Sequence, residues 1–183
     1  MLRAIPTKIQ DVLILEYNQR HDPRGTVFPN YSKRELEALG LVAEFVEEYL
    51  YCPVKKGTLY GIHFQNDPKA QTKVIACTQG RGLDYAVDLR RASLTYKQWI
   101  CVELNPENKR QLYVPKGCGH AFLTLEDHTH IRYRIDEYAD PELQRAITYK
   151  DPDLNIPFDV DNPVLSEQDA NAPYLKDSDC NYE

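Results

Sequence analysis

Apolar and polar positions alternate over short distances along most of this chain, which is the rhythm of β-strands rather than of helices. The alternating or apolar runs are separated by turn residues and fall at residues 11–17, 57–65, 73–78, 83–90, 99–104, 111–114, 121–125 and 130–135. Short strands at intervals of roughly 8–12 residues are typical of sandwiches and barrels, not of βαβ units. We therefore predict an all-β jelly roll with short peripheral helices, formed by one domain over residues 1–183.

Between residues 32 and 51 the short alternation of apolar and polar residues is interrupted. Ser32 is a good N-cap and Glu35 lies three residues later, so a capping box predicts a short helix through about Leu39, ended by Gly40. Residues 41–51 carry spaced apolar side chains and are predicted to form a strand. Beyond residue 149 the chain is rich in Asp, Pro and Asn. We expect this tail to wrap the barrel, with short turns or a short helix near residues 166–170.

The run 57–65 holds a histidine near two glycines, and a second histidine, His120, follows a Pro-Lys-Gly turn. Regular alternation places two sets of side chains on opposite faces: Tyr60, Ile62 and Phe64 on one, and Leu59, Gly61, His63 and Gln65 on the other. Two partly buried histidines of no special function are one interpretation. The other is that His63 and His120 line a cavity in the barrel.

Composition and charge exclude several classes of protein. Of the 183 residues, 42% are hydrophobic, and no run approaches the roughly 18 apolar residues of a membrane span. The first residues lack the apolar core of a signal peptide, so we expect a cytoplasmic protein without a membrane partner. The net charge of −6 argues against a general nucleic-acid surface, although a local basic pocket for phosphates remains possible.

The residues that commonly bind metals are scattered. The five cysteines form no CxxC pair, which favours reduced thiols over disulfides or a zinc site. A cupin-like metal site usually needs two histidines close together, a carboxylate and a further histidine. His128 and His130 are close, but they follow Glu126 and Asp127 at a predicted turn, which favours a solvated turn. We predict no metal.

Acid–base chemistry is the remaining possibility for His63. An imidazole with a pKa near 6.5 accepts a proton at neutral pH when a carboxylate orients the ring. Asp169 and Asp84 are among the candidate carboxylates, and their spacing does not choose between them. Tyr133 and Tyr138, near a late strand, are candidate proton donors, although thirteen tyrosines make plain packing an alternative.

Two cations complete the candidate chemistry. Lys73 begins the strand after the His63 strand, where its charge can stabilise a developing oxyanion. Arg24 follows a turn and is a candidate phosphate ligand.

Several ordered motifs together resemble the dTDP-4-dehydrorhamnose 3,5-epimerase family over most of the chain. The family pattern Gly-x-Leu-Arg-Gly-Leu-His-Tyr-Gln resembles residues 57–65, and Asp-Val-x-Val-Asp-Leu-Arg resembles residues 84–90. Further similar stretches are residues 71–73, 93–99, 107–115, 117–122, 151–154 and 165–169.

The resemblance implies a cupin-like jelly-roll homodimer that epimerises a nucleotide-linked 4-keto-6-deoxy sugar without a cofactor, in deoxysugar or polysaccharide synthesis. Carried over residue by residue, it implies a catalytic set in which His63 is the base, Asp169 its partner, Lys73 the cation at the enolate oxygen and Tyr133 the proton donor. It implies that His120 binds the sugar and Arg24 the phosphates. Further substrate contacts are expected at Gln65, Glu47, Tyr60 and Tyr138.

The chain departs from the family pattern in three places. Tyr60 occupies the position of a family arginine. Glu47 and Tyr49 occupy the positions of the Gln and Asn in a family Gln-x-Asn motif, and Ala139 occupies the position of a second family tyrosine. A carboxylate in place of neutral donors disfavours a nearby pyrophosphate. The nucleotide and sugar therefore stay open. The alternatives are a single-centre epimerase, an epimerase of another nucleotide sugar, and a non-catalytic sugar-binding jelly roll.

Overall fold

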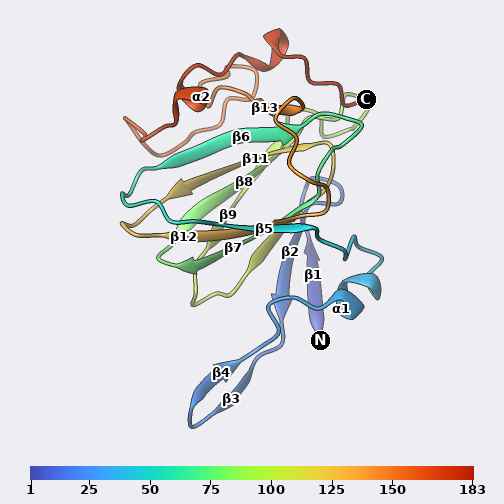
Figure 1. The fold of residues 1–183 in the computed structure, drawn as a ribbon, viewed down its shortest axis with the longest axis vertical. Helices are drawn as coiled ribbons and strands as arrows, with labels where there is room; N and C mark the ends of the chain where they lie inside the picture. The colour runs from blue at the N-terminus through green and yellow to red at the C-terminus, as the bar shows by residue number, and fades with distance from the viewer.

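Two antiparallel sheets face each other (Figure 1). Apolar side chains fill the space between them. The computed structural model describes all residues from 1 to 183. The six-stranded sheet contains, in spatial order, β1 (Leu2–Pro6), β2 (Leu13–Tyr17), β10 (Gln111–Val114), β7 (Lys73–Gln79), β12 (His130–Ile135) and β5 (Glu47–Tyr51). The five-stranded sheet contains β13 (Gln144–Ala146), β6 (Leu59–Gln65), β11 (Cys118–Thr124), β8 (Gly82–Asp88) and β9 (Trp99–Leu104). The predicted all-β, cupin-like jelly roll is confirmed.

The remaining elements lie at the periphery. The hairpin of β3 (Arg20–Asp22) and β4 (Gly25–Val27) projects away from both sheets, at the lower end of Figure 1. The helices are α1 (Lys33–Glu37), α2 (Glu167–Ala170) and the 3-10 turn η1 (Leu175–Asp177). None of these helices has the length and apolar character that crossing a lipid bilayer requires.

Local capping explains where the helices begin and end. The Ser32 hydroxyl accepts the Glu35 N–H at the start of α1, as the capping signal predicts. Regular helix ends at Glu37, two residues earlier than expected, and Gly40 then adopts a φ of +71°. The predicted helix near residues 166–170 is also confirmed, because Ser166 caps α2 by accepting the Asp169 N–H at 3.1 Å.

The predicted strand over residues 41–51 is wrong in its first half. Only Glu47–Tyr51 forms a strand, because only this part finds a hydrogen-bonding partner, β12. Leu41, Ala43 and Phe45 instead pack with Leu36 in an apolar cluster over the outer face of the six-stranded sheet. The spacing of these apolar side chains therefore reflects their packing in this cluster with α1, and not pairing with another strand. The edge strand β1 was not expected from the pattern.

Three apolar clusters hold the layers together. One fills the space between the sheets and includes Ile75, Leu112 and Phe122. A second covers the outer face of the five-stranded sheet and includes residues of the C-terminal tail, among them Leu154 and Tyr182. The tail therefore wraps the barrel as predicted, and its end lies close to the five-stranded sheet (Figure 1).

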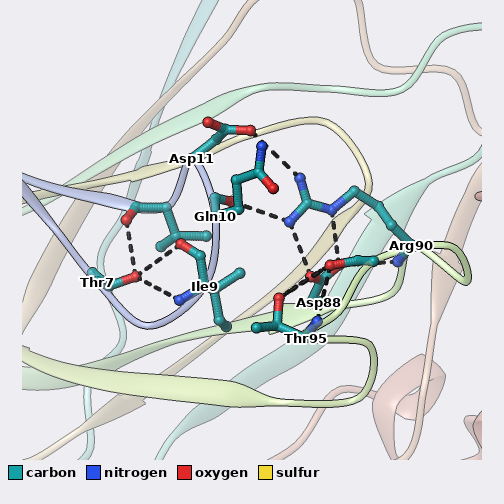
Figure 2. A network of polar contacts seen from close by, with 9 residues as sticks. Thr7, Ile9, Gln10, Asp11, Asp88, Arg90 and Thr95 are labelled. Carbon is teal, nitrogen blue, oxygen red and sulfur yellow. Dashed lines mark hydrogen bonds and ion pairs between the residues drawn. The ribbon is translucent and has the colours of Figure 1, made fainter.

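A polar network fastens the N-terminal loop to the end of β8 (Figure 2). The Asp88 carboxylate accepts hydrogen bonds from Arg90 Nε at 2.8 Å and from the Thr95 hydroxyl at 2.6 Å. Arg90 also donates to the Gln10 carbonyl at 3.1 Å. Thr7 closes the loop itself by donating to the carbonyl of Val12 at 2.9 Å. This network lies outside the cavity described below and stabilises the barrel.

A β-bulge in β6 overturns the predicted assignment of faces. His63 pairs with His120 and Tyr60 with Phe122, so three steps along β6 oppose two along β11. The bulge centres on Gly61, whose φ is +100° and where an added Cβ would lie 2.4 Å from the His120 carbonyl oxygen. As a result Leu59 packs outside with Ile62 and Phe64, whereas Tyr60 joins His63 on the inner face.

Candidate active site

A cavity of about 200 Å³ lies inside the jelly roll, between the edge of one sheet and the edge of the other. It is lined by Tyr49, Tyr51, His63, Phe64, Gln71, Lys73, Tyr133, Ile135, Ala139, Gln144, Arg145 and Gln168. Pockets that enclose drug-sized ligands measure roughly 300–1,000 Å³. This cavity therefore suits a single six-membered ring, with the rest of a larger ligand outside.

His63 enters the cavity from β6, and a buried carboxylate holds its ring. Its Nε2 lies 2.5 Å from Asp169 Oδ1, and the imidazole keeps 32% of its surface exposed. Burial opposes ionisation of Asp169, but the hydrogen bond and charge of His63 outweigh it and lower the pKa of this carboxyl. Since Nε2 is occupied, Nδ1 is the nitrogen left to accept a proton. This arrangement is that of an oriented general base.

Lys73 enters from β7 in the opposite sheet. Its side chain is buried, and burial lowers its pKa to about 8, an effect that the charge of Asp84 partly opposes. At neutral pH the ammonium is therefore mostly protonated. A cation in a dry cavity stabilises negative charge that develops on a nearby oxygen.

Tyr133 enters from β12, also in the sheet opposite His63. Its hydroxyl lies 2.9 Å from that of Tyr51. Burial, together with this hydrogen bond, raises the pKa of Tyr133. The phenol therefore keeps its proton at neutral pH, as a proton donor must.

A second histidine–aspartate pair lies beside the first. His120, the direct cross-strand partner of His63, places Nε2 at 2.5 Å from Asp84 Oδ1. Asp84 is fully buried, its Oδ2 has no hydrogen-bond partner, and burial raises its pKa against the lowering effect of His120 and Lys73. His120 is more enclosed than His63, with 11% of its side chain exposed.

Four tyrosines form a continuous row along the inner face beside the cavity. Tyr60 stacks on Tyr51 with ring centroids 4.8 Å apart, and Tyr133 stacks on Tyr49 at 5.2 Å. Tyr51 and Tyr133 lie 5.1 Å apart and join the two pairs. The Tyr49 hydroxyl donates to Glu47 Oε2 at 2.9 Å, which ends the row in a carboxylate. One wall of the cavity is therefore aromatic.

Comparison with known proteins assigns this arrangement to a family. The family model described as dTDP-4-dehydrorhamnose 3,5-epimerase matches residues 6–177. The chain belongs to this family. The dTDP-4-dehydrorhamnose 3,5-epimerase of Shigella flexneri is 37% identical over 179 residues, which cover 97% of this chain and 98% of that protein. The family resemblance inferred from the sequence motifs is thus confirmed.

Solved structures of epimerases share the fold. The dTDP-4-dehydrorhamnose 3,5-epimerase of Bacillus anthracis, with TDP and pyrophosphate bound, matches with a TM-score of 0.92 and 40% identity, over 95% of this chain and 99% of that one. A Legionella pneumophila dTDP-6-deoxy-D-glucose-3,5-epimerase in complex with dTDP-4-keto-L-rhamnose matches with a TM-score of 0.91 and 35% identity, over 98% and 95% of the two chains.

Within this epimerase-family chain, the four residues predicted as catalytic come together. His63, Lys73 and Tyr133 line one cavity, and Asp169 lies directly behind His63. His120 lies beside them in the same layer.

The predicted substrate-binding residues are more dispersed. Arg24 is exposed on the projecting hairpin, paired with Asp22 at 2.7 Å, and does not join the cavity of its own chain. Tyr138 is 60% exposed in the loop after β12 and does not line the cavity. Gln65 is buried, donating to the carbonyls of Lys69 and Tyr138 at 2.6 and 3.0 Å. Its amide supports the loop beside the cavity.

Glu47 and Tyr60 lie at the two ends of the tyrosine row. Glu47 accepts the Tyr49 hydroxyl and also the Ala139 N–H at 3.2 Å, so it is tied to the loop after β12. Tyr60 faces inward only because of the bulge at Gly61.

Sequence reasoning missed several residues of the cavity wall. Tyr51 could have been found from the alternation of Glu47, Tyr49 and Tyr51, which share one face of β5. No such signal exists for Gln144, Arg145 and Gln168, which reach the cavity from β13 and from α2. The chain contains no group of three or more His, Cys, Asp or Glu side chains arranged to hold a metal ion.

Proposed function

We propose that this chain inverts C3 and C5 of a nucleotide-linked 4-keto-6-deoxy sugar, as in the conversion of dTDP-4-dehydro-6-deoxyglucose to dTDP-4-dehydrorhamnose. The observation that carries the proposal is the placement of a base and an acid on opposite walls of one cavity. His63 comes from the five-stranded sheet, and Tyr133 from the six-stranded sheet. Inversion of a carbon centre needs this opposition, because the proton must leave one face of the ring and return to the other.

Each step follows from the chemistry of the ketone. A carbonyl at C4 acidifies the C–H bonds at C3 and C5, because the electron pair left after deprotonation delocalises onto its oxygen as an enolate. His63 Nδ1 takes the proton, and ionised Asp169 stabilises the imidazolium that forms. The Lys73 ammonium stabilises the enolate oxygen. Tyr133 then gives its proton to the opposite face of the carbon. These steps move only protons and need no redox cofactor.

Deuterium incorporation tests the proposal. The protein is incubated in D₂O with dTDP-4-dehydro-6-deoxyglucose, and the sugar is analysed by NMR. Deuterium at both C3 and C5, with conversion to the rhamno product, is the expected result. Exchange at one carbon only would instead establish a single-centre epimerase. Absence of exchange with dTDP, CDP, GDP and UDP forms of the sugar would leave a binding protein and overturn the proposal.

We also propose a homodimer in which Arg24 serves the partner copy. The hairpin that carries Arg24 projects away from its own sheets (Figure 1). Arg24 can therefore approach a substrate phosphate only in the cavity of a second chain. Sedimentation equilibrium at micromolar concentration should give a dimer mass. A monomer with full activity would contradict the dimer and the role of Arg24 together.

A further inference from the structure

We propose that Tyr51 is a positioning residue for the proton donor Tyr133, a role that rests on the proposed function. The two hydroxyl oxygens lie 2.9 Å apart, and neither makes another hydrogen bond within the chain. A phenol O–H rotates about its C–O bond, so a single fixed partner decides where its proton and lone pairs point. Tyr51 is that partner.

The position of Tyr51 follows from the strand register. Tyr51 pairs directly with Ile131 across β5 and β12, and Tyr49 pairs with Tyr133. Tyr51 is therefore the diagonal neighbour of Tyr133 on the inner face, a spacing that long aromatic side chains bridge. Both strands present these side chains inward, so the contact does not depend on a loop.

Stacking fixes both rings. Tyr51 lies against Tyr60 with an interplanar angle of 13°, and Tyr133 lies against Tyr49 with an angle of 14°. Tyr60 reaches this stack only because the Gly61 bulge turns it inward. Tyr60 therefore supports the ring of Tyr51, and Tyr49 supports the ring of Tyr133. The hydroxyls of Tyr51 and Tyr133 meet where the two stacked pairs adjoin. Aromatic pairs of this kind stabilise each other beyond the effect of burial alone, which holds both rings in place.

The hydrogen bond has a defined part in the proton transfers. When Tyr133 gives its proton to the enolate carbon, its O–H bond breaks, the C–H bond forms, and Tyr133 becomes a phenolate. The Tyr51 hydroxyl then donates to that phenolate, a charge-assisted bond stronger than the neutral one before transfer. The phenolate regains a proton from solvent before the next turnover, and His63 releases the proton it removed. The proton count is therefore balanced.

This role predicts a specific partition of the enolate. Without Tyr51 the His63 side is unchanged, so deprotonation and return of deuterium to the original face continue. Delivery to the opposite face slows, because Tyr133 loses its orientation and its phenolate loses a donor. Hydrogen bonds to charged groups support an effect of about tenfold or more.

The experiment compares inversion with exchange in D₂O for wild type and Tyr51→Phe. Expected is at least a tenfold fall in the ratio of deuterated epimer to deuterated starting sugar, with kcat lowered and KM within about twofold. Tyr113→Phe is the matched control. It also removes one tyrosine hydroxyl, which accepts the Val42 N–H at 3.2 Å on the outer face of the six-stranded sheet. Its ratio should equal that of wild type.

Each outcome is decisive. A wild-type ratio in Tyr51→Phe overturns the inference while leaving the proposed function intact, whereas no exchange in wild type overturns the proposed function itself. Thermal unfolding confirms that each variant folds. If Tyr51→Phe does not fold, Tyr51→His keeps a planar ring against Tyr60 but shortens the side chain. The same fall in ratio is then expected, and an unchanged ratio overturns the inference.

Discussion

Two histidine–aspartate pairs lie side by side in this jelly roll, and the proposed function uses only one of them as a base. Both join Nε2 to Oδ1 at 2.5 Å, and His63 and His120 are direct cross-strand partners on β6 and β11. They differ in access, since 32% of the His63 side chain is exposed but only 11% of the His120 side chain. The two pairs therefore share their hydrogen-bond geometry, and what distinguishes the proposed base is the exposure of its imidazole to the cavity.

The carboxylates differ as much as the rings. Asp169 is buried, yet hydrogen bonds from His63, Ser166 and the Gly61 backbone outweigh burial and lower its pKa. Asp84 has one oxygen without a partner, and burial dominates and raises its pKa. An ionised carboxylate stabilises an imidazolium, so the Asp169 pair suits proton abstraction. The Asp84 pair also faces Lys73 and helps keep that ammonium charged.

The largest effect should come from replacing the exposed histidine. His63→Asn should lower kcat by about 10²–10⁴-fold, the usual contribution of a general base, and should abolish deuterium exchange. His120→Asn, the matched change in the second pair, should mainly raise KM and leave exchange detectable. The comparison fails if the two variants lose exchange equally while both remain folded by circular dichroism.

A smaller effect is expected at Lys73, the buried cation that enters the cavity from the opposite sheet. Lys73→Met should lower kcat by about 10²-fold, because one preorganised group no longer stabilises the enolate oxygen. The folded pKa of Lys73 is about 8, so activity of the wild type should fall as pH rises through that value and the ammonium loses its proton. Lys73→Arg should move this fall to higher pH. If the activity of Lys73→Arg falls over the same alkaline pH range as that of the wild type, deprotonation of Lys73 does not cause the fall.

The smallest expected effect is on the stability of the fold, and it has opposite pH dependence at Asp169 and Asp84. The lowered pKa of Asp169 gives stability that is present above the unfolded value of 3.8 and lost as pH falls through the folded value. The raised pKa of Asp84 gives the reverse, stability present below 3.8 and lost as pH rises through its folded value.

Urea unfolding between pH 3 and 7 measures this contrast. At pH 7, Asp169→Asn should lower the free energy of unfolding by about 1–3 kcal/mol, since a hydrogen bond to a charged group is lost. Asp84→Asn should lower it by less, because it also removes a buried charge. Equal losses for both variants would show that the pairs do not differ in ionisation.

Much of the fold was predictable because a strand in a two-layer sheet shows a local pattern of apolar and polar residues. The runs from residue 57 to 135 alternate or are apolar throughout, and each forms a strand close to its predicted bounds. The Ser32 cap acts within four residues, so the first short helix was predicted from it. The tail was expected to form short turns or a short helix near residues 166–170, and the structure shows the helix. Residues 41–46 were not predicted correctly, since their apolar side chains serve a cluster that brings distant segments together.

The site divides in the same way. The sequence alone indicated the family, because its motifs occur at fixed spacing, and the family model confirms it. The same motifs carry His63, Lys73, Tyr133 and Asp169, the residues proposed as catalytic. Only the tertiary structure decided which face each residue occupies. One positive φ at Gly61 shifts the β6 register and turns Tyr60 inward onto Tyr51. A bulge depends on the partner strand and on a backbone angle, and neither is visible in the alternation of residues. The contact between Tyr51 and Tyr133 joins strands 82 positions apart in the sequence, so folding had to bring it together.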